Sequence, residues 1–306
     1  MTVVVLGAGR GIGREITRQL VEAGREVRGV TRSGGVPEGA EDVRADLLDR
    51  DAAVRAVRGA TVVHLAANVP YTDWVTTLPT LVDNAVFAAR EAGAKLVFAD
   101  NLYAYGPVST PLVETMPERP VGPKEKLRSA LGRRIREAGV PFAIGRSSDY
   151  YGPGGVGSLP GELVLKPMAT GRGAMWFASV DVPQTFAFLG DTARAQVVLG
   201  DSAAANGGVW HTPAAPVVTV REFAALAGTV LGRPGKVMRL PSVTVTLGAL
   251  VDKRLRGMGE LAHQRAKPWV VDHSAFLKAF GPFDVTPHAE AIARTAEWYR
   301  AAQAGS

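Results

Sequence analysis

The stretch that decides the fold opens the chain: Thr2-Val3-Val4-Val5-Leu6-Gly7-Ala8-Gly9-Arg10-Gly11-Ile12-Gly13. Its apolar, mostly β-branched start predicts a buried strand, and the helical spacing of Ile16, Leu20 and Val21 predicts an amphipathic helix after it. Glycines between the two permit a tight turn, close approach of the backbone to a pyrophosphate and close packing of helix on strand. The stretch therefore predicts a dinucleotide-binding βαβ unit with phosphates at the start of the helix.

Strand-like and helical segments continue to alternate through the first half of the chain. Apolar strands separated by helices indicate a parallel sheet that is covered on both faces. We therefore predict the α/β class, with a doubly wound parallel Rossmann sheet whose ligands bind at the carboxyl ends of its strands. The predicted strands are 2–6, 27–31, 43–47, 61–66, 95–99 and 142–146, and the predicted helices are 13–23, 51–57, 81–92 and 124–138.

The character of the sequence changes near residue 150. Residues 152–161 and 166–173 are rich in glycine and proline, which is typical of loops. We predict a Rossmann domain over 1–150, with a return segment near 186–212 that includes a strand at 208–211. A smaller, mostly helical C-terminal substrate domain is expected over 151–306, where Met175, Trp176 and Phe177 are candidates to wall an apolar pocket.

Composition narrows the classes of function. The 306 residues are 46% hydrophobic and 21% charged and contain no cysteine, which excludes disulfides, thiolate metal sites and a cysteine nucleophile. The five histidines are too dispersed to suggest a metal site. The net charge of +6 is spread along the chain, so we expect no nucleic acid partner. Without a signal-peptide pattern or an apolar run long enough to span a bilayer, we expect a cytoplasmic protein that does not bind membranes.

The second predicted strand bears on the choice between NAD and NADP. NAD-binding units carry an acidic residue about 20 positions after the glycines, but this chain has Thr31-Arg32-Ser33 there. Arg32, with Arg10 in the glycine loop, is suited to pair with a 2′-phosphate. The sequence therefore favours NADP(H). Asp46 is a candidate to accept a hydrogen bond from the adenine amino group or, alternatively, to cap the next helix.

Several dispersed motifs, in the right order, give the chain a wider resemblance. They are Val63-His64-Leu65-Ala66-Ala67, Tyr105-Gly106, Tyr151-Gly152-Pro153, Gly190-Asp191-Thr192-Ala193 and Trp210-His211. With the glycine loop, they resemble the short-chain dehydrogenase/reductase superfamily. The loop resembles that of the shorter, single-domain branch, and the later motifs resemble the extended branch, the NAD-dependent epimerase/dehydratase family. The resemblance and the glycine loop together imply these cofactor-binding residues: Gly7, Gly9, Arg10, Gly11, Ile12, Gly13, Arg32, Asp46, Leu47, Leu65, Ala66, Ala67 and Lys124.

The resemblance implies catalysis by a tyrosine, a lysine four residues later and a serine or threonine on the preceding strand. Lys124 stands at the expected distance, but Pro120 occupies the tyrosine position and Asn101 the hydroxyl position. We therefore assign Lys124 the ribose-binding role and Asn101 the polarisation of a carbonyl through its amide N–H groups. Among the tyrosines near strand ends, Tyr103 is favoured as the relocated acid because it follows Asn101. The other candidates are Tyr105, Tyr150 and Tyr151.

Three functions stay open. The first is NADPH-dependent reduction of a small carbonyl compound. The second is hydride transfer to a conjugated carbonyl compound or an imine, which makes less demand on a proton donor. The third is NADP(H) binding without turnover, as in a redox sensor. A sugar-nucleotide epimerase or dehydratase ranks below these, because its cycle needs the missing tyrosine. The expected partner is a small-molecule substrate. The oligomeric state is left open, with a homodimer as one candidate.

Two further side chains have competing interpretations. Asp100, at a strand end, is a candidate base or a carboxylate bonded to nearby backbone. His64 lies within an apolar strand, which indicates a hydrogen-bonded core histidine in preference to a base.

Overall fold

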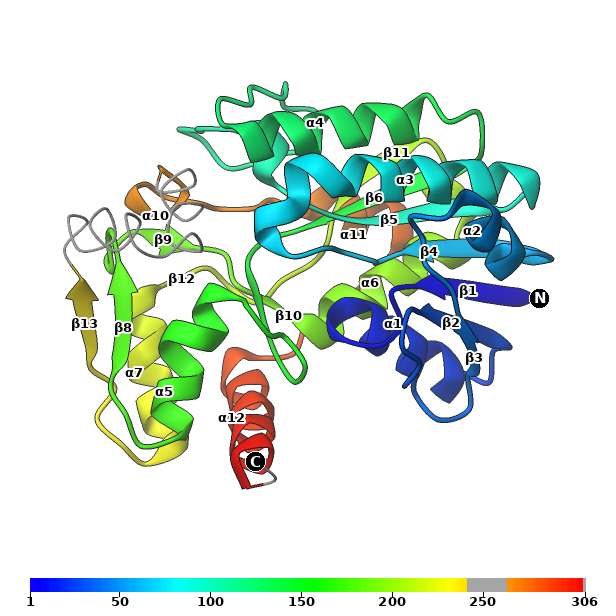
Figure 1. Ribbon diagram of the computed structural model, residues 1–306. Coiled ribbons are helices and arrows are strands. Elements are labelled where there is room, and N and C mark those ends of the chain that lie inside the picture. Colours follow the sequence, from blue (N-terminus) through cyan, green and yellow to red (C-terminus); the bar gives the residue numbers. More distant parts are fainter. Residues whose placement is uncertain (241–262, 305–306) are drawn as a thin grey trace.

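A computed structural model describes residues 1–240 and 263–304 of the protein. Its centre is a seven-stranded sheet with the order β11-β6-β5-β4-β1-β2-β3, in which every neighbouring pair is parallel (Figure 1). The predicted doubly wound parallel sheet is therefore confirmed. Its strands are β1 (Thr2–Leu6), β2 (Val27–Thr31), β3 (Glu41–Arg44), β4 (Ala60–Leu65), β5 (Lys95–Asn101), β6 (Phe142–Ser147) and β11 (Gly208–His211).

Helices cover both faces of this sheet (Figure 1). One face carries α2 (Arg50–Val57), α3 (Trp74–Glu91) and α4 (Pro123–Arg136), and the other carries α1 (Gly11–Glu22), α6 (Leu189–Asp201) and α11 (Ser274–Phe280). Strand β1 shows why both faces of the sheet are buried. Val4 and Leu6 pack in the core under α2 and α3, whereas Val3 and Val5 pack in the core under α1, because successive side chains of a strand point to opposite faces.

A second hydrophobic core lies beyond the carboxyl edge of the sheet, built around Tyr151, Trp176, Phe186 and Phe223. Trp176 is 1% exposed, so it fills this core and lines no described cavity. The predicted domain boundary near residue 150 stays a prediction. The elements of this region are β7 (Tyr150–Tyr151), the π-helix η3 (Pro160–Leu165), α5 (Lys166–Ala169), β8 (Ala174–Phe177), β9 (Pro183–Gln184), β10 (Ala187–Phe188), β12 (Val218–Thr219), α7 (Val220–Leu231), β13 (Val237–Leu240), α10 (His263–Ala266) and α12 (His288–Ala304).

Three short 3-10 turns complete the described part of the chain: η1 (Tyr71–Asp73), η2 (Tyr103–Tyr105) and η4 (Ala203–Ala205). The predicted helical character of the C-terminal region also included residues 241–262, which lie outside the described residues.

Two element boundaries differ from the sequence prediction by three residues or more. Helix α3 begins at Trp74, seven residues before the predicted Leu81, although Pro79 lies inside it. Proline removes one hydrogen bond from a helix, but the buried side chains of Trp74 and Leu78 anchor this first part on the core. Strand β3 ends at Arg44, and not at Leu47, because Oδ1 of Asp46 accepts a hydrogen bond from the backbone N–H of Leu48 and turns the chain.

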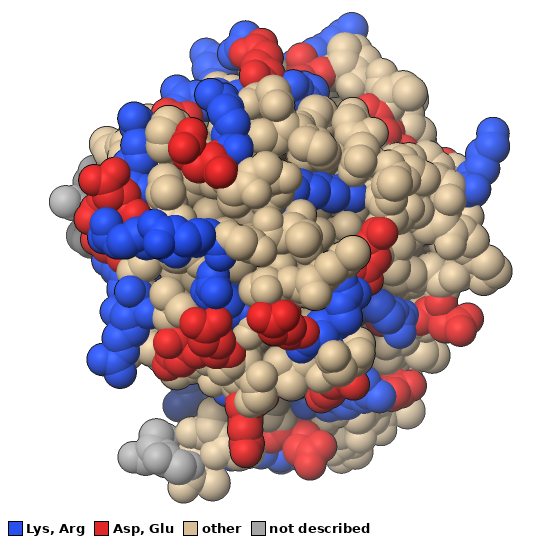
Figure 2. Space-filling model, turned by 90° about the vertical axis from the view of Figure 1, so that its right-hand side faces the viewer, with Lys and Arg blue, Asp and Glu red and all other residues tan. Residues whose placement is uncertain are grey.

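Two further features concern the distribution of charge on the surface and the apolar character of the helices. On the face shown in Figure 2, basic and acidic side chains lie interspersed. Within the described ranges, no helix combines the length and the apolar character that crossing a membrane requires.

Candidate cofactor-binding and active site

The glycine loop between β1 and α1 is tightly enclosed by its surroundings. Gly7 has a φ of +94°, and a Cβ there would lie 2.5 Å from Cα of Ala67. A Cβ on Gly13 would lie 2.2 Å from the carbonyl oxygen of Gly7. Neither position has room for a side chain. The two glycines therefore allow α1 to pack close against the ends of β1 and β4.

The amino-terminal end of α1 is open toward the glycine loop. Its N-cap residue, Arg10, makes no capping hydrogen bond through its side chain, and no acidic residue occupies the first turn. The first N–H groups of a helix have no partner within it, and the helix dipole adds a partial positive charge there. This end of α1 is thus suited to bind a phosphate.

A cleft of about 600 Å³ runs along the carboxyl ends of β1, β2, β3 and β4. It is lined by ten of the predicted cofactor-binding residues, namely Gly7, Gly9, Arg10, Gly11, Ile12, Arg32, Asp46, Leu47, Ala66 and Ala67. Three others are absent from its lining. Gly13 lies within the first turn of α1, Leu65 is 1% exposed in the core under the sheet, and Lys124 lies on α4.

One end of the cleft lies between β2 and β3. Arg10 and Arg32 are both exposed and both line it, and Oγ1 of Thr31 accepts a hydrogen bond of 2.7 Å from the N–H of Gly34, which shapes the loop after β2. Asp46 also faces the cleft. The alternative role of Asp46 as the cap of the next helix is wrong, because Oδ1 of Asp49 accepts from the first N–H groups of α2.

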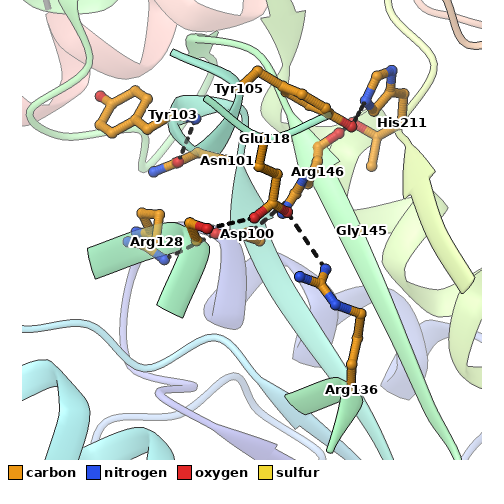
Figure 3. A network of polar contacts seen from close by, with 12 residues as sticks. Asp100, Asn101, Tyr103, Tyr105, Glu118, Arg128, Arg136, Gly145, Arg146 and His211 are labelled. Atoms are coloured by element: carbon orange, nitrogen blue, oxygen red, sulfur yellow. Dashed lines mark hydrogen bonds and ion pairs between the residues drawn. The ribbon is translucent and has the colours of Figure 1, made fainter. Parts of the chain in front are cut away.

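The other end of the cleft lies toward β5 and β6, where Tyr150 lines it. Asn101 is the last residue of β5, and its Oδ1 accepts a 3.0 Å hydrogen bond from the backbone N–H of Tyr103. This bond turns the chain into η2 and leaves the amide N–H groups of Asn101 as its donors. In Figure 3, the side chains of Asn101 and Tyr103 point away from His211.

Asn101 and Tyr103 do not line the cleft, and Tyr150 does. Burial is the main influence on the pKa of both Tyr103 and Tyr150. It raises the pKa of the Tyr103 phenol and of the Tyr150 phenol, and the neighbouring Asp149 carboxylate raises both further. Asp149 is itself paired with Arg265 at 3.2 Å. Both phenols therefore stay protonated at neutral pH, where they are hydrogen-bond donors and not bases.

Asp100 lies in a buried network of ions and is not a base with a free carboxylate. Its oxygens accept from Nη1 of Arg128 at 3.3 Å and from Nε of Arg146 at 3.2 Å (Figure 3). Nη2 of Arg146 also bonds Glu118 at 2.6 Å. Both sequence interpretations of Asp100 missed these partners, because neither arginine is near it in sequence.

Two of the candidate tyrosines are structural. The hydroxyl of Tyr105 is 2.8 Å from Nε2 of His211, and the hydroxyl of Tyr151 is 2.7 Å from Nδ1 of His288. Both rings are 1% exposed or less. His64, as predicted, is a core residue and is 2% exposed, but its Nδ1 has no hydrogen-bond partner among the residues that the structure describes.

Lys124 contacts a residue that the sequence patterns did not single out. Its Nζ lies 3.9 Å from the ring centroid of Tyr71, the first residue of η1. Tyr71 directly follows Val69 and Pro70, which line the cleft. The available signal was its position just past the carboxyl end of β4, where ligands of parallel sheets bind.

Comparisons with known proteins agree with this architecture. A search of curated protein sequences found no match. The fold is similar to that of a UDP-glucose 4-epimerase of Thermus thermophilus in complex with NAD, with 21% identity, a TM-score of 0.76 and coverage of 99% of this chain and 100% of that one. It is also similar to the enzyme WbmH of Bordetella bronchiseptica in complex with NAD⁺, with 20% identity, a TM-score of 0.78 and coverage of 98% of both chains.

A third similar structure is a UDP-glucuronic acid 4-epimerase of Bacillus cereus in complex with NAD, with 14% identity, a TM-score of 0.81 and coverage of 100% of this chain and 99% of that one. The model of the NAD dependent epimerase/dehydratase family matches residues 3–210, which span the glycine loop and all seven strands of the sheet up to Trp210. With the expected motifs in place on this fold, the chain belongs to the NAD-dependent epimerase/dehydratase family.

Proposed function

We propose that this protein is an NADPH-dependent reductase of a small carbonyl compound, or of a conjugated carbonyl compound or imine. The choice of NADPH as the cofactor rests on two exposed arginines, Arg10 and Arg32, that line the same cleft. Guanidinium groups bind phosphate through paired hydrogen bonds, so this pair suits the 2′-phosphate that distinguishes NADP from NAD.

The rest of the cleft fits the same dinucleotide. The side-chain-free surfaces of Gly7 and Gly9 and the open start of α1 suit the pyrophosphate. Asp46 and Leu47 line the end where the adenine would lie, and Ala66 and Ala67 line the wall formed by β4. The similar structures named above contain NAD. A preference for NADP would set this chain apart from them.

The side chains that follow the carboxyl ends of β5 and β6 favour reduction over oxidation. NADPH, when bound, supplies a hydride. Asn101 donates an amide N–H to the oxygen or nitrogen that gains negative charge, as an oxyanion-hole donor does. Tyr103 and Tyr150 stay protonated because of burial, so they can donate hydrogen bonds but cannot accept a proton from an alcohol. An enzyme that first oxidises a hydroxyl group needs a base, and neither of these two phenols supplies one.

Sugar-nucleotide epimerisation is the second candidate. It is favoured by the similarity in fold, over nearly the whole chain, to the two UDP-sugar 4-epimerases. Against it stands Pro120, which has no proton to exchange at the position of the family's tyrosine. NADP(H) binding without turnover is the third candidate.

Cofactor choice is tested by titrating NADPH and NADH into the protein and following the cofactor fluorescence. We expect tighter binding of NADPH, and Arg32→Ala to weaken NADPH binding about 10- to 100-fold, the value of one hydrogen bond between charged groups, while NADH binding barely changes. Arg133→Ala is the matched control, because Arg133 is an exposed arginine in the last turn of α4. Equal affinity of the wild-type protein for both cofactors would contradict the preference for NADP.

The reaction is tested by mixing the protein with NADPH and with simple aldehydes, ketones, conjugated enones and cyclic imines, and following loss of the reduced nicotinamide absorbance. UDP-glucose and UDP-glucuronic acid are incubated in parallel with NAD and NADP, and the sugars are analysed by chromatography. Oxidation of NADPH by any carbonyl or imine class supports the reductase. Interconversion of the sugar nucleotides with no such oxidation replaces it with the epimerase, and cofactor binding without any turnover favours the sensor.

A further inference from the structure

A lysine and a tyrosine from different elements meet beside the cleft. Lys124 is the second residue of α4 and is 8% exposed, and its Nζ lies 3.9 Å from the ring centroid of Tyr71 in η1. Trp74 packs edge-on against the Tyr71 ring, with the two centroids 4.9 Å apart. The ammonium group therefore lies over the face of a phenol that is held by a neighbouring indole.

Neither residue of this pair lines the cleft itself, but the chain segment just before η1 does. Tyr71 comes directly after Pro70, which lines the cleft at the carboxyl end of β4. The Trp74 ring is also near Tyr103, with the two ring centroids 6.1 Å apart. Tyr103 comes two residues after Asn101, the last residue of β5. Tyr71 thus lies in the connection that follows β4, and Asn101 is the last residue of the adjacent strand β5.

We propose that Tyr71 is the acid–base residue of this site, supplying from η1 the phenol that Pro120 removes from the segment before α4. For its substrate, the inference rests on the proposed reductase function. In the proposed step, the π bond of the substrate's C=O or C=N group breaks. Its carbon gains the hydride that bound NADPH would give up, and its oxygen or nitrogen gains the phenolic proton of Tyr71. The phenolate left behind recovers a proton from water.

The physical basis is the charge of Lys124. A cation within a few ångström favours the ionised form of an acid, and partial burial strengthens the effect because water screens it less. Asp73 is exposed in the same turn as Tyr71, and the guanidinium of Arg128 stacks on the Trp74 ring at 4.1 Å. The charge of Arg128 is shared with the Asp100 carboxylate, so Lys124 is the cation that the proposal depends on.

The remaining tyrosines make this inference open to direct measurement. Burial raises the pKa of each of the other five phenols: Tyr103, Tyr105, Tyr150, Tyr151 and Tyr299. A phenol that ionises below its ordinary pKa of about 10 should therefore stand alone in a titration of the folded protein.

The experiment is a titration of the full-length protein, without cofactor or substrate, that follows the ultraviolet absorbance of phenolate. We expect one phenol to ionise about 1 to 3 pH units below the ordinary value. Tyr71→Phe, which keeps the ring over Lys124, should remove this transition, and Lys124→Gln should move it to higher pH. Tyr299→Phe, on α12, is the control and should leave it in place. Circular dichroism at each pH establishes that the protein is still folded.

The inference is overturned if no early transition occurs, or if it persists in Tyr71→Phe. Neither result depends on a substrate, so failure of the reductase proposal and failure of this assignment are distinguishable. Once a substrate is found, Tyr71→Phe should lower kcat about 10²- to 10⁴-fold, the usual contribution of a general acid, and Tyr103→Phe should lower it far less. The reverse order of the two variants would assign the acid to Tyr103.

Discussion

Asp100 and Arg146 form a buried ion pair at the carboxyl edge of the sheet, with Nε of the arginine 3.2 Å from Oδ2 of the aspartate. The two residues are opposite each other in the register of β5 and β6, and both side chains are 1% exposed or less. Arg128 completes the contacts of the aspartate from α4. The pair therefore ties together the two strands and the helix that carry Asn101 and Lys124.

Removing the charge of Asp100 should destabilise the protein strongly. Asp100→Asn leaves two buried guanidinium groups without their shared carboxylate, and breaking one partner of a buried pair costs about 3 to 5 kcal/mol. The free energy of unfolding is measured by urea denaturation. The matched control is Asp181→Asn, which breaks an ion pair with Arg221 in which both side chains are more than half exposed, and which should leave stability nearly unchanged. Equal effects of the two substitutions would contradict the role assigned to Asp100.

The glycine loop should not tolerate a methyl group at its first helical turn. Gly13→Ala places a Cβ 2.2 Å from the carbonyl oxygen of Gly7, so α1 must shift away from β1. We expect a loss of about 1 to 3 kcal/mol in stability and loss of NADPH binding, measured by thermal unfolding and fluorescence titration. Gly173→Ala is the control, because a Cβ there meets no atom within 4 Å. Unimpaired NADPH binding by Gly13→Ala would show that the close approach is unnecessary.

Asn101 has two roles that one substitution can separate. Asn101→Asp keeps an oxygen that can accept from the N–H of Tyr103, but it replaces the amide donor with a carboxylate. We expect little change in the unfolding temperature. With a substrate that the enzyme reduces, we expect kcat to fall about 10²- to 10³-fold, as for loss of an oxyanion-hole donor. Asn101→Ala should lower both quantities. A kcat unaffected by Asn101→Asp would exclude the amide from the reaction.

Acid should destabilise the fold through His64. Burial lowers the pKa of His64 to about 3, whereas an unfolded histidine has a pKa of about 6.5. Between these values the unfolded chain binds the additional proton, so stability falls as the pH falls, by about 1.4 kcal/mol per pH unit for one full proton. Urea denaturation at a series of pH values measures this slope, and His64→Gln should reduce it by one proton. An unchanged slope in the variant would place the effect on other groups.

Much of the framework could be predicted from local patterns. The run of apolar residues before Gly7 and the glycines up to Gly13 predict strand, turn and helix, since each depends on neighbours within a few residues. Helix α7 was also predictable, because Thr219 and Glu222 form a capping box at its start. The start of α3 was not, because the local preference of Pro79 was overridden by burial of Trp74.

The same distinction, between short-range patterns and long-range contacts, applies to the chemistry of the site. The sequence by itself determined the dinucleotide-binding unit, Arg32 in place of an acidic residue, and the loss of tyrosine at Pro120, because these follow from residue types at short spacings. Only the tertiary structure decided that Asp100 is neutralised by Arg128 and Arg146, that Tyr105 belongs to the core, and that Tyr71 meets Lys124. Those contacts join residues 28 to 106 positions apart, and such distances are closed by the packing of strands and helices and not by any local preference of the chain.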